Sequence, residues 1–368
     1  MTPNNLTNNS KMSKLFETYQ LGNLSLKNRV VMAPMTRSRA IGNIPNELMA
    51  NYYSQRADAG LIITEGTSPS PNGAGYPRIP GVWSDEQVAA WKKVTDAVHT
   101  NDGKIFLQIM HTGRVGHKNN LPKGAEVLAP SAIQAAGEMY TDQAGPQPHP
   151  TPRVMNLDDI KQAREEYVNA AKNAIKAGFD GVELHAANGY LLEQFISPIT
   201  NQRADEYGGN IEKRSRFVIE VAQEVVHAIG ADKTAIRLSP YGVNADMKPF
   251  EETEEAFAYL AKALGELNLA YVHVADHSAM GAPEVSDSVK KAIRKNFGGT
   301  YVLSGGYDKV SAENDLIAGK GDLVAFGRPF ISNPDLVSRL ENDVELAQPD
   351  FNTFYTPGEQ GYTDYPTA

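Results

Sequence analysis

Three polar residues stand close together in the segment HAANGY, residues 185–190. His185 and Asn188 can each present an N–H donor, and two such donors can hold one carbonyl oxygen while negative charge develops on it. Tyr190 adds an O–H group that can protonate a carbanion or an enolate in a dry pocket. The same residue types also suit a structural histidine followed by a turn. Residues elsewhere in the chain must decide between these interpretations.

Thr36, Gln108 and Arg237 are polar residues near the ends of three further apolar runs. Together they could surround a flat heteroaromatic ligand with hydrogen-bond donors and acceptors. A buried arginine needs an anionic partner. For Arg237 this partner is either a ligand, such as a reduced flavin, or a carboxylate, for which Glu65 and Glu183 are candidates.

Two glycine-containing segments, SGGY (304–307) and FGRPF (326–330), point to an anion site. Gly305, Gly306 and Gly327 would let backbone N–H groups approach a phosphate, and Arg328 would add positive charge. The loops after the last two strands are where α/β barrels commonly bind phosphate. Tight turns alone would also explain these glycines.

Eight short apolar runs alternate with amphipathic helical stretches. The runs are residues 30–35, 61–67, 105–111, 181–187, 234–240, 271–277, 301–306 and 323–329. They are almost continuously apolar, as strands buried on both faces are. Helices are expected at 86–100, at 157–178 with Asn156 as N-cap and Gly178 at its end, at 216–230, and from near Glu251, Val285, Ser311 and Pro334. The alternation predicts an α/β fold, a (β/α)₈ TIM barrel with the polar strand ends on one face.

Three segments add to the barrel repeat. A β-hairpin is expected at 19–29, where it would plug the end of the barrel opposite the polar residues. Residues 112–155 are rich in Gly and Pro, and because they follow the third strand they predict an insertion that caps the active-site mouth. The chain ends in a Tyr-rich tail at 351–368. We expect one domain over residues 14–368, preceded by a disordered tail at 1–13.

The composition argues against several classes of protein. The net charge is -9 and no run of Lys and Arg is present, so neither nucleic acid nor a membrane surface is an expected partner. Because the chain contains no cysteine, it has no disulfide, thiolate metal site or iron–sulfur cluster. No apolar stretch approaches the roughly 20 residues of a membrane span, and the amino terminus lacks the apolar core of a signal peptide. We therefore expect a cytoplasmic protein.

Several longer segments resemble the Old Yellow Enzyme family, especially its bacterial ene-reductases. The similarity is collinear from Leu15 to Pro366. It rests on APMTRSR (33–39), TEGT (64–67), HTGR (111–114), HAANGYLLEQF (185–195), NQRADEYGGN (201–210), FGRP (326–329) and GYTDYP (361–366). A second branch of that family carries Cys at the position of Thr36, and dienoyl-CoA reductases carry an iron–sulfur cluster. A chain without cysteine therefore resembles the classical branch.

The resemblance implies a non-covalently bound FMN at the barrel mouth. The family pattern places Pro34, Thr36, Gly66, Gln108 and Arg237 around its ring, and Gly305, Gly306, Gly327 and Arg328 at its phosphate. NADPH or NADH would reduce the flavin and leave before an electron-poor alkene binds. The implied substrates are α,β-unsaturated carbonyl compounds, maleimides and nitro compounds, with nitrate esters and nitroaromatics as further candidates.

The resemblance also assigns roles to the HAANGY segment. His185 and Asn188 would hold the carbonyl or nitro oxygen of the substrate. Hydride from flavin N5 would reach the β-carbon while Tyr190 protonates the α-carbon from the opposite face. These small-molecule ligands would be the partners of a monomer or a weak homodimer.

Tyr76, Met110 and Tyr355 match substrate-lining positions of the family. Many relatives carry Trp where this chain has Met110, a flexible side chain that is expected to reshape the pocket and change the stereopreference.

Two other functions fit parts of the sequence. A metal-dependent barrel hydrolase or lyase could draw its ligands from His111, His185, Asp276 and His277. Most strand ends carry amides, hydroxyls and glycines, so we expect a flavin site and no metal. A non-catalytic flavin-binding barrel would bind FMN without NADPH-dependent turnover, and the presence of Tyr190 argues against it.

Overall fold

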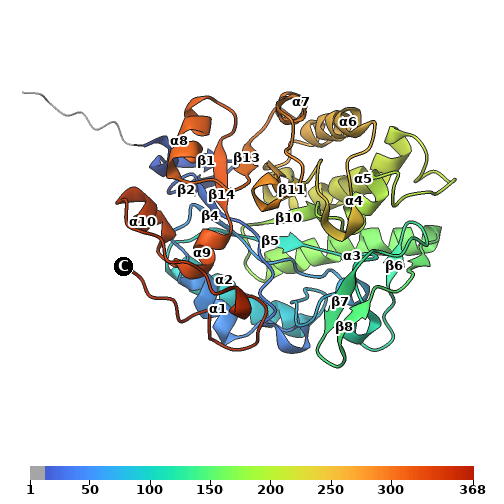
Figure 1. The fold of residues 1–368 in the computed structure, drawn as a ribbon, viewed down its shortest axis with the longest axis horizontal. Helices are drawn as coiled ribbons and strands as arrows, with labels where there is room; N and C mark the ends of the chain where they lie inside the picture. The colour runs from blue at the N-terminus through green and yellow to red at the C-terminus, as the bar shows by residue number, and fades with distance from the viewer. Residues whose placement is uncertain (1–12) are drawn as a thin grey trace, which may run out of the picture.

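The computed structural model describes residues 13–368, and its centre is a closed barrel of eight parallel strands (Figure 1). The strands are β3 (Val30–Met32), β4 (Leu61–Ile63), β5 (Ile105–Ile109), β10 (Gly181–Ala186), β11 (Thr234–Leu238), β12 (Val272–Val274), β13 (Tyr301–Ser304) and β14 (Leu323–Phe326). β14 pairs with β3 and closes the ring. The predicted (β/α)₈ barrel is confirmed. The disordered tail predicted at 1–13 lies outside the described residues except for Ser13.

Helices follow the strands around the outside of the barrel. They are α1 (Glu47–Ser54), α2 (Asp85–Thr100), α3 (Leu157–Lys176), α4 (Leu191–Ile196), α5 (Ile211–Ile229), α6 (Thr253–Glu266), α7 (Asp287–Phe297), α8 (Lys309–Ile317), α9 (Arg328–Ser332) and α10 (Leu336–Glu341). Short 3₁₀-helices are η1 (Lys14–Phe16), η2 (Ile41–Asn43), η3 (Pro71–Gly73), η4 (Lys118–Asn120), η5 (Ala231–Lys233), η6 (Asn244–Asp246), η7 (Ser278–Met280) and η8 (Phe351–Thr353). Within residues 13–368, no helix has both the length and the apolar character to cross a membrane.

The helix ends show which sequence signals were sufficient. Asn156 caps α3 as predicted, because its side chain accepts a hydrogen bond from the N–H of Asp159. α5 begins at Ile211 rather than at residue 216 because the Asn210 side chain caps it by accepting from the N–H of Lys213. The sequence did not predict α1, α4 and α9, which have 8, 6 and 5 residues and are too short to show a helical period.

The predicted hairpin near the amino terminus of the chain closes the end of the barrel at which the strands begin. β1 (Tyr19–Leu21) and β2 (Leu24–Leu26) pair antiparallel. Leu21 and Leu26 are buried in one apolar cluster with Leu61, Phe106 and Ala235. Since these three residues lie near the starts of their strands, the hairpin plugs the amino-terminal end and leaves the carboxyl-terminal end for a ligand.

The insertion at 112–155 contains short strands that the sequence did not predict. They are β6 (Leu128–Ala129), β7 (Glu138–Thr141), β8 (Gly145–Pro148) and β9 (Arg153–Val154). β7 and β8 form an antiparallel hairpin that lies far from β1 and β2 in Figure 1. The Asn120 side chain donates hydrogen bonds to the carbonyl oxygens of Gly75, at 3.0 Å, and Tyr140, at 2.9 Å. These bonds tie the insertion to the loop after β4.

Shortening a buried side chain of the β1–β2 hairpin tests whether this hairpin stabilises the barrel. We expect Leu26→Ala to lower the free energy of unfolding by about 2–5 kcal/mol, because the buried side chain leaves a cavity that the rigid barrel cannot fill. Ser25→Ala, at an exposed position of the same strand, should change it by less than about 0.5 kcal/mol. Urea denaturation of both variants measures the difference, and equal losses would show that the hairpin does not support the barrel.

Candidate active site

A cavity of about 2430 Å³ lies at the carboxyl-terminal ends of the strands. Its wall combines loops after the strands with parts of the insertion and of the carboxyl-terminal tail. The predicted site residues on this wall are Pro34, Thr36, Tyr76, Asn188, Tyr190, Arg237, Gly305, Gly306, Gly327, Arg328 and Tyr355. Gly66, Gln108, Met110 and His185 are not part of the wall.

Inside the barrel, the buried carboxylate of Glu183 on β10 gathers polar side chains from neighbouring strands. Gln108 Nε2 and the Tyr271 hydroxyl each donate to it at 2.8 Å, and His273 Nδ1 donates at 3.0 Å. Burial alone would raise the pKa of Glu183, but His273, Arg237 and these hydrogen bonds outweigh it and hold the pKa below its ordinary value. The carboxylate is therefore ionised, and it fixes the amide orientation of Gln108.

Arg237 on β11 is a buried cation with an unused donor. Its Nε atom has no hydrogen-bond partner among the described residues. Neither carboxylate that the sequence offered as a partner forms a hydrogen bond with Arg237. Glu183 accepts the three bonds above and acts on Arg237 through its charge, and Glu65 accepts from the Tyr53 hydroxyl at 2.7 Å. A buried guanidinium in this condition fits an anionic ligand at the cavity wall.

His185 lies near the end of β10 as a neutral donor. Its Nδ1 atom accepts a hydrogen bond from the backbone N–H of Ala187 at 3.3 Å, so Nε2 carries the proton of the neutral ring. Burial, together with the nearby charge of Arg237, lowers the pKa of His185 well below its ordinary value. The ring meets that of Tyr190 edge-on, with the centroids 4.9 Å apart.

Asn188 is held in a conformation that few side chains adopt. Its φ is 57°, in the left-handed region that asparagine tolerates. The backbone N–H donates to Ser239 Oγ at 2.7 Å, and the carbonyl oxygen accepts from Asn244 Nδ2 at 2.8 Å. His277 Nε2 donates to Asn188 Oδ1 at 2.7 Å. Because the amide oxygen is engaged, the amide N–H₂ group is left to bind a ligand.

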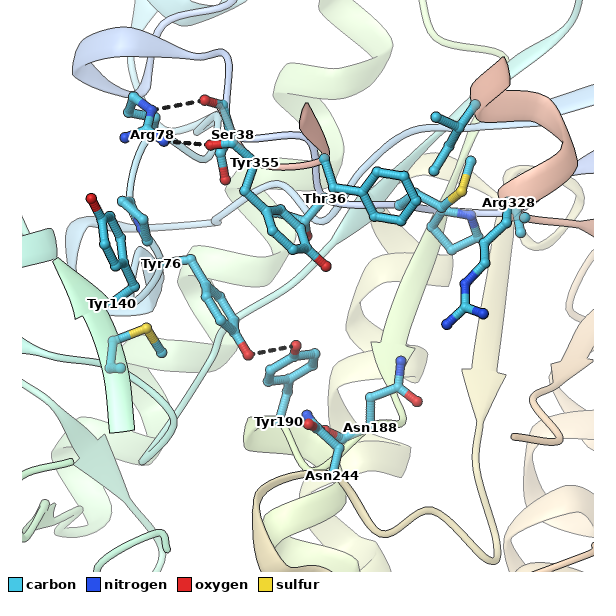
Figure 2. A pocket seen from close by; sticks show the side chains of 18 of the residues that line it. Thr36, Ser38, Tyr76, Arg78, Tyr140, Asn188, Tyr190, Asn244, Arg328 and Tyr355 are labelled. Carbon is cyan, nitrogen blue, oxygen red and sulfur yellow. Dashed lines mark hydrogen bonds between the residues drawn. The ribbon is translucent and has the colours of Figure 1, made fainter. Parts of the chain in front are cut away.

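The hydroxyl groups of Tyr190 and Tyr76 meet at the cavity wall. The oxygens lie 2.9 Å apart in a hydrogen bond that Figure 2 shows as a dashed line. Burial, with the adjacent Tyr76, raises the pKa of Tyr190 well above its ordinary value. The phenol therefore stays protonated at neutral pH. Met110 belongs to the same apolar cluster as Tyr190 and is 1% exposed, so its expected effect on substrate orientation stays a prediction.

Glu193, which the sequence did not single out, braces the HAANGY turn. Its carboxyl group accepts from the N–H of Gly189 and contacts Ser239 Oγ at 3.2 Å. Ser239 in turn accepts from the N–H of Asn188, so the carboxyl group supports the turn from below. No sequence signal identified this role, because the N-cap of α4 is Tyr190, which makes no capping hydrogen bond with its side chain.

At the two glycines that follow β13, the positive φ angles and the neighbouring atoms leave no room for a Cβ. Gly305 and Gly306 have φ of 136° and 66°, and a Cβ on either would lie 2.6 Å from its neighbour. A Cβ on Gly66 would lie 2.4 Å from Met110 Sδ. Arg328 lies 5.5 Å from the ring centroid of Phe351, in the carboxyl-terminal tail.

Two buried arginines, which the sequence also did not single out, hold the carboxyl-terminal tail on the cavity. Arg39 donates to the carbonyl oxygens of Phe354, at 2.7 Å, and Thr353, at 2.8 Å. Arg37 donates to that of Gly361 at 2.7 Å. Both lie in the segment APMTRSR after β3, and they set the position of Tyr355 on the wall.

The residues proposed for a metal site do not come together. Lys290 Nζ lies 2.7 Å from Asp276 Oδ2, and His277 is bonded to Asn188. Residues 13–368 contain no group of three or more His, Asp or Glu side chains arranged to hold a metal ion. By contrast, Arg237, Asn188 and Tyr190 line one cavity, and the neutral ring of His185 packs edge-on against Tyr190. This arrangement is the one expected of a flavin-dependent barrel oxidoreductase.

Comparison with known proteins supports this class. Residues 14–347 match the NADH:flavin oxidoreductase / NADH oxidase family. The chain is 40% identical to 12-oxophytodienoate reductase 7 of Oryza sativa subsp. japonica, covering 97% of this chain and 95% of that protein. The chain belongs to this FMN-dependent family of oxidoreductases, also known as the Old Yellow Enzyme family.

Solved structures show the same fold over the same length. Morphinone reductase has a TM-score of 0.93 and 43% sequence identity, with 97% of each chain covered. The old yellow enzyme homologue from Zymomonas mobilis has a TM-score of 0.92 and 42% identity, over 96% of this chain and 99% of that one.

Glu193 gives a pH-dependent prediction. Burial raises its pKa to about 8, above the roughly 4.3 of an unfolded Glu, so between these values the folded state holds a proton that the unfolded state has lost. This contribution to stability is complete below about pH 4 and disappears as the pH rises through 8. Between about pH 5 and 8, the carboxyl group of Glu193 makes the free energy of unfolding fall as the pH rises. We expect Glu193→Gln to make this fall shallower by up to about 1 kcal/mol per pH unit.

Urea denaturation at several pH values measures this slope. Glu255→Gln, at an exposed position of α6, is the matched control and should keep the parent slope. If Glu193→Gln and the parent declined in parallel, the buried carboxyl group would not be protonated in the folded protein.

Proposed function

We propose that the protein is an NAD(P)H-dependent ene-reductase that reduces the C=C bond of α,β-unsaturated carbonyl compounds, maleimides and nitroalkenes. The observation that carries this proposal is the pair of neutral N–H donors, His185 and Asn188, beside the protonated hydroxyl of Tyr190 at one strand end. An electron-poor alkene needs both kinds of group, because reduction places charge on its activating oxygen and requires a proton at carbon.

The residues present fit FMN. Pro34, Thr36, Gly66, Gln108 and Arg237 would hold its ring, and Gly305, Gly306, Gly327 and Arg328 its phosphate. The unpartnered Nε of Arg237 supports this assignment, because the ring of a reduced flavin carries negative charge. When bound, FMN supplies the capacity to take a hydride from NADPH or NADH and pass it to the alkene.

His185 and Asn188 would hold the carbonyl or nitro oxygen. The bond from Ala187 to Nδ1 directs the His185 proton to Nε2, and the bond from His277 to Oδ1 leaves the Asn188 amide N–H₂ for the substrate. Both donors are neutral and fixed before the substrate arrives, so little reorganisation is needed as charge develops.

Tyr190 would deliver the proton to the α-carbon. Its raised pKa keeps the proton available across the neutral range, and the hydrogen bond with Tyr76 orients the hydroxyl group. Tyr76 and Tyr355 would line the space for the substrate, and Met110 would support it from within the apolar cluster.

Separating the two half-reactions tests the role of Tyr190. We expect Tyr190→Phe to leave reduction of the bound flavin by NADPH or NADH near the parent rate. Reoxidation by 2-cyclohexenone should slow by about 100-fold or more, because the general acid is lost. Anaerobic stopped-flow absorbance measures both rates. Equal slowing of the two steps would refute the role, and a barrel that binds FMN without any turnover would refute the proposed function.

Phenol binding tests the oxygen clamp. A phenol can place its oxygen between the two donors, so the double variant His185→Ala, Asn188→Ala should weaken binding by about 10- to 100-fold, measured from the change in the flavin spectrum. Tyr190→Phe keeps both donors and should retain most of the affinity. An unchanged dissociation constant in the double variant would exclude the clamp.

A further inference from the structure

Six large apolar side chains of the described residues are exposed at the cavity wall: Ile41, Tyr140, Val243, Met280, Phe351 and Tyr355. Three of them lie on segments that contact Arg78. Ile41, Tyr140 and Tyr355 are 68%, 53% and 60% exposed, and all three line the cavity. They come from η2, β7 and the carboxyl-terminal tail. A soluble protein exposes such residues singly over its surface, but a group around a ligand site marks a binding surface.

Arg78 joins the three segments that carry this apolar rim. Its Nε donates to the carbonyl oxygen of Ser38 at 2.9 Å, and its Nη2 donates to that of Tyr355 at 2.6 Å (Figure 2). Its Nη1 pairs with Asp142. The carbonyl oxygen of Arg78 accepts from the N–H of Ala40, the residue before Ile41. The three segments are therefore tied to one another through Arg78 and do not form three independent loops.

The rim is continuous with the reacting end of the site. Tyr76 stands two residues before Arg78 in the chain and shares its hydrogen bond with Tyr190. In Figure 2, Tyr76 reaches from the Arg78 group to Tyr190. Tyr76, Tyr190 and the three rim residues all line the same cavity. A substrate held at Tyr190 can therefore extend past Tyr76 to the rim.

The charges around the rim favour a neutral occupant. Asp142 is paired with Arg78, and the wall also carries the carboxylates of Glu86 and Glu138, of which Glu138 stands two residues before Tyr140 on β7. The cations Arg237 and Arg328 belong to the part of the wall assigned to FMN. An anionic group carried to this position would meet repulsion. The rim therefore combines apolar contact with rejection of negative charge.

We propose that Ile41, Tyr140 and Tyr355 bind the part of the substrate remote from its double bond, and that the preferred alkenes are neutral molecules with a large apolar substituent. This inference rests on the proposed ene-reductase function and adds a substrate class to it. A second copy of the chain is a weaker occupant, because three side chains expose only a few hundred Å² against the roughly 800 Å² per partner of a stable interface.

A series of N-alkylmaleimides tests the proposal, since every member has the same reacting double bond. The FMN-loaded enzyme is assayed with N-methyl-, N-butyl- and N-hexylmaleimide. Each methylene that becomes buried should raise kcat/KM by up to about 4-fold, so we expect N-hexylmaleimide to exceed N-methylmaleimide by at least about 10-fold. N-(5-carboxypentyl)maleimide, of similar length but anionic, should lose this gain.

Two rim variants and a matched control assign the effect to these residues. Ile41→Ser and Tyr140→Ser should each reduce the N-hexyl to N-methyl ratio by about 3-fold or more, because apolar contact area is removed. Val310→Ser is the control, since Val310 is 66% exposed on α8 but outside the cavity wall, and it should keep the parent ratio.

The outcomes separate this proposal from the proposed function. A parent ratio near one, an equal gain for the carboxylate, or rim variants that match Val310→Ser would overturn the role of the rim. Failure to reduce any maleimide would instead overturn the ene-reductase function. In that case, dissociation constants from the flavin spectrum still test whether affinity rises with chain length. Self-association that Ile41→Ser abolishes, with a flat chain-length series, would assign the rim to a dimer interface.

Discussion

The ionised carboxylate of Glu183 is the interaction on which the barrel interior depends. A buried charge is costly unless it is hydrogen-bonded. Gln108 on the neighbouring strand β5 supplies one donor, and Tyr271 and His273 at β12, two strands away on the other side, supply two more. This arrangement turns Gln108 into a fixed polar group. It also leaves Arg237 Nε without a hydrogen-bond partner, a donor that the proposed flavin would use.

Above this layer, burial keeps the reactive groups in the protonation states that the proposed chemistry needs. It lowers the pKa of His185 and raises that of Tyr190, so one side chain is a neutral donor and the other a protonated acid. Their directions come from backbone contacts around the HAANGY turn, which Glu193 and Ser239 hold. The polar residues are therefore set before a substrate binds, which lowers the cost of stabilising developing charge.

The mouth of the cavity is built from segments far apart in the chain. Arg37 and Arg39 bind backbone carbonyl oxygens of the carboxyl-terminal tail, and Arg78 links that tail to the insertion. Arginine suits this task because its several donors can satisfy carbonyl groups that no regular strand or helix pairs. The barrel thus provides the strand ends, while three arginines hold the loops and the tail at the cavity wall.

The sequence by itself determined the barrel and the hairpin plug, because strand burial and helical period are local patterns. It also determined which polar residues stand at the strand ends, and the three polar residues of HAANGY lie within one turn. It did not determine the short helices α1, α4 and α9, or the strands of the insertion, whose patterns are too brief to read. Only the tertiary structure showed that Arg237 Nε has no hydrogen-bond partner, that Glu193 supports the turn, and that Ile41, Tyr140 and Tyr355 line one cavity. These features depend on contacts between residues as much as some 300 positions apart, and no local pattern encodes such contacts.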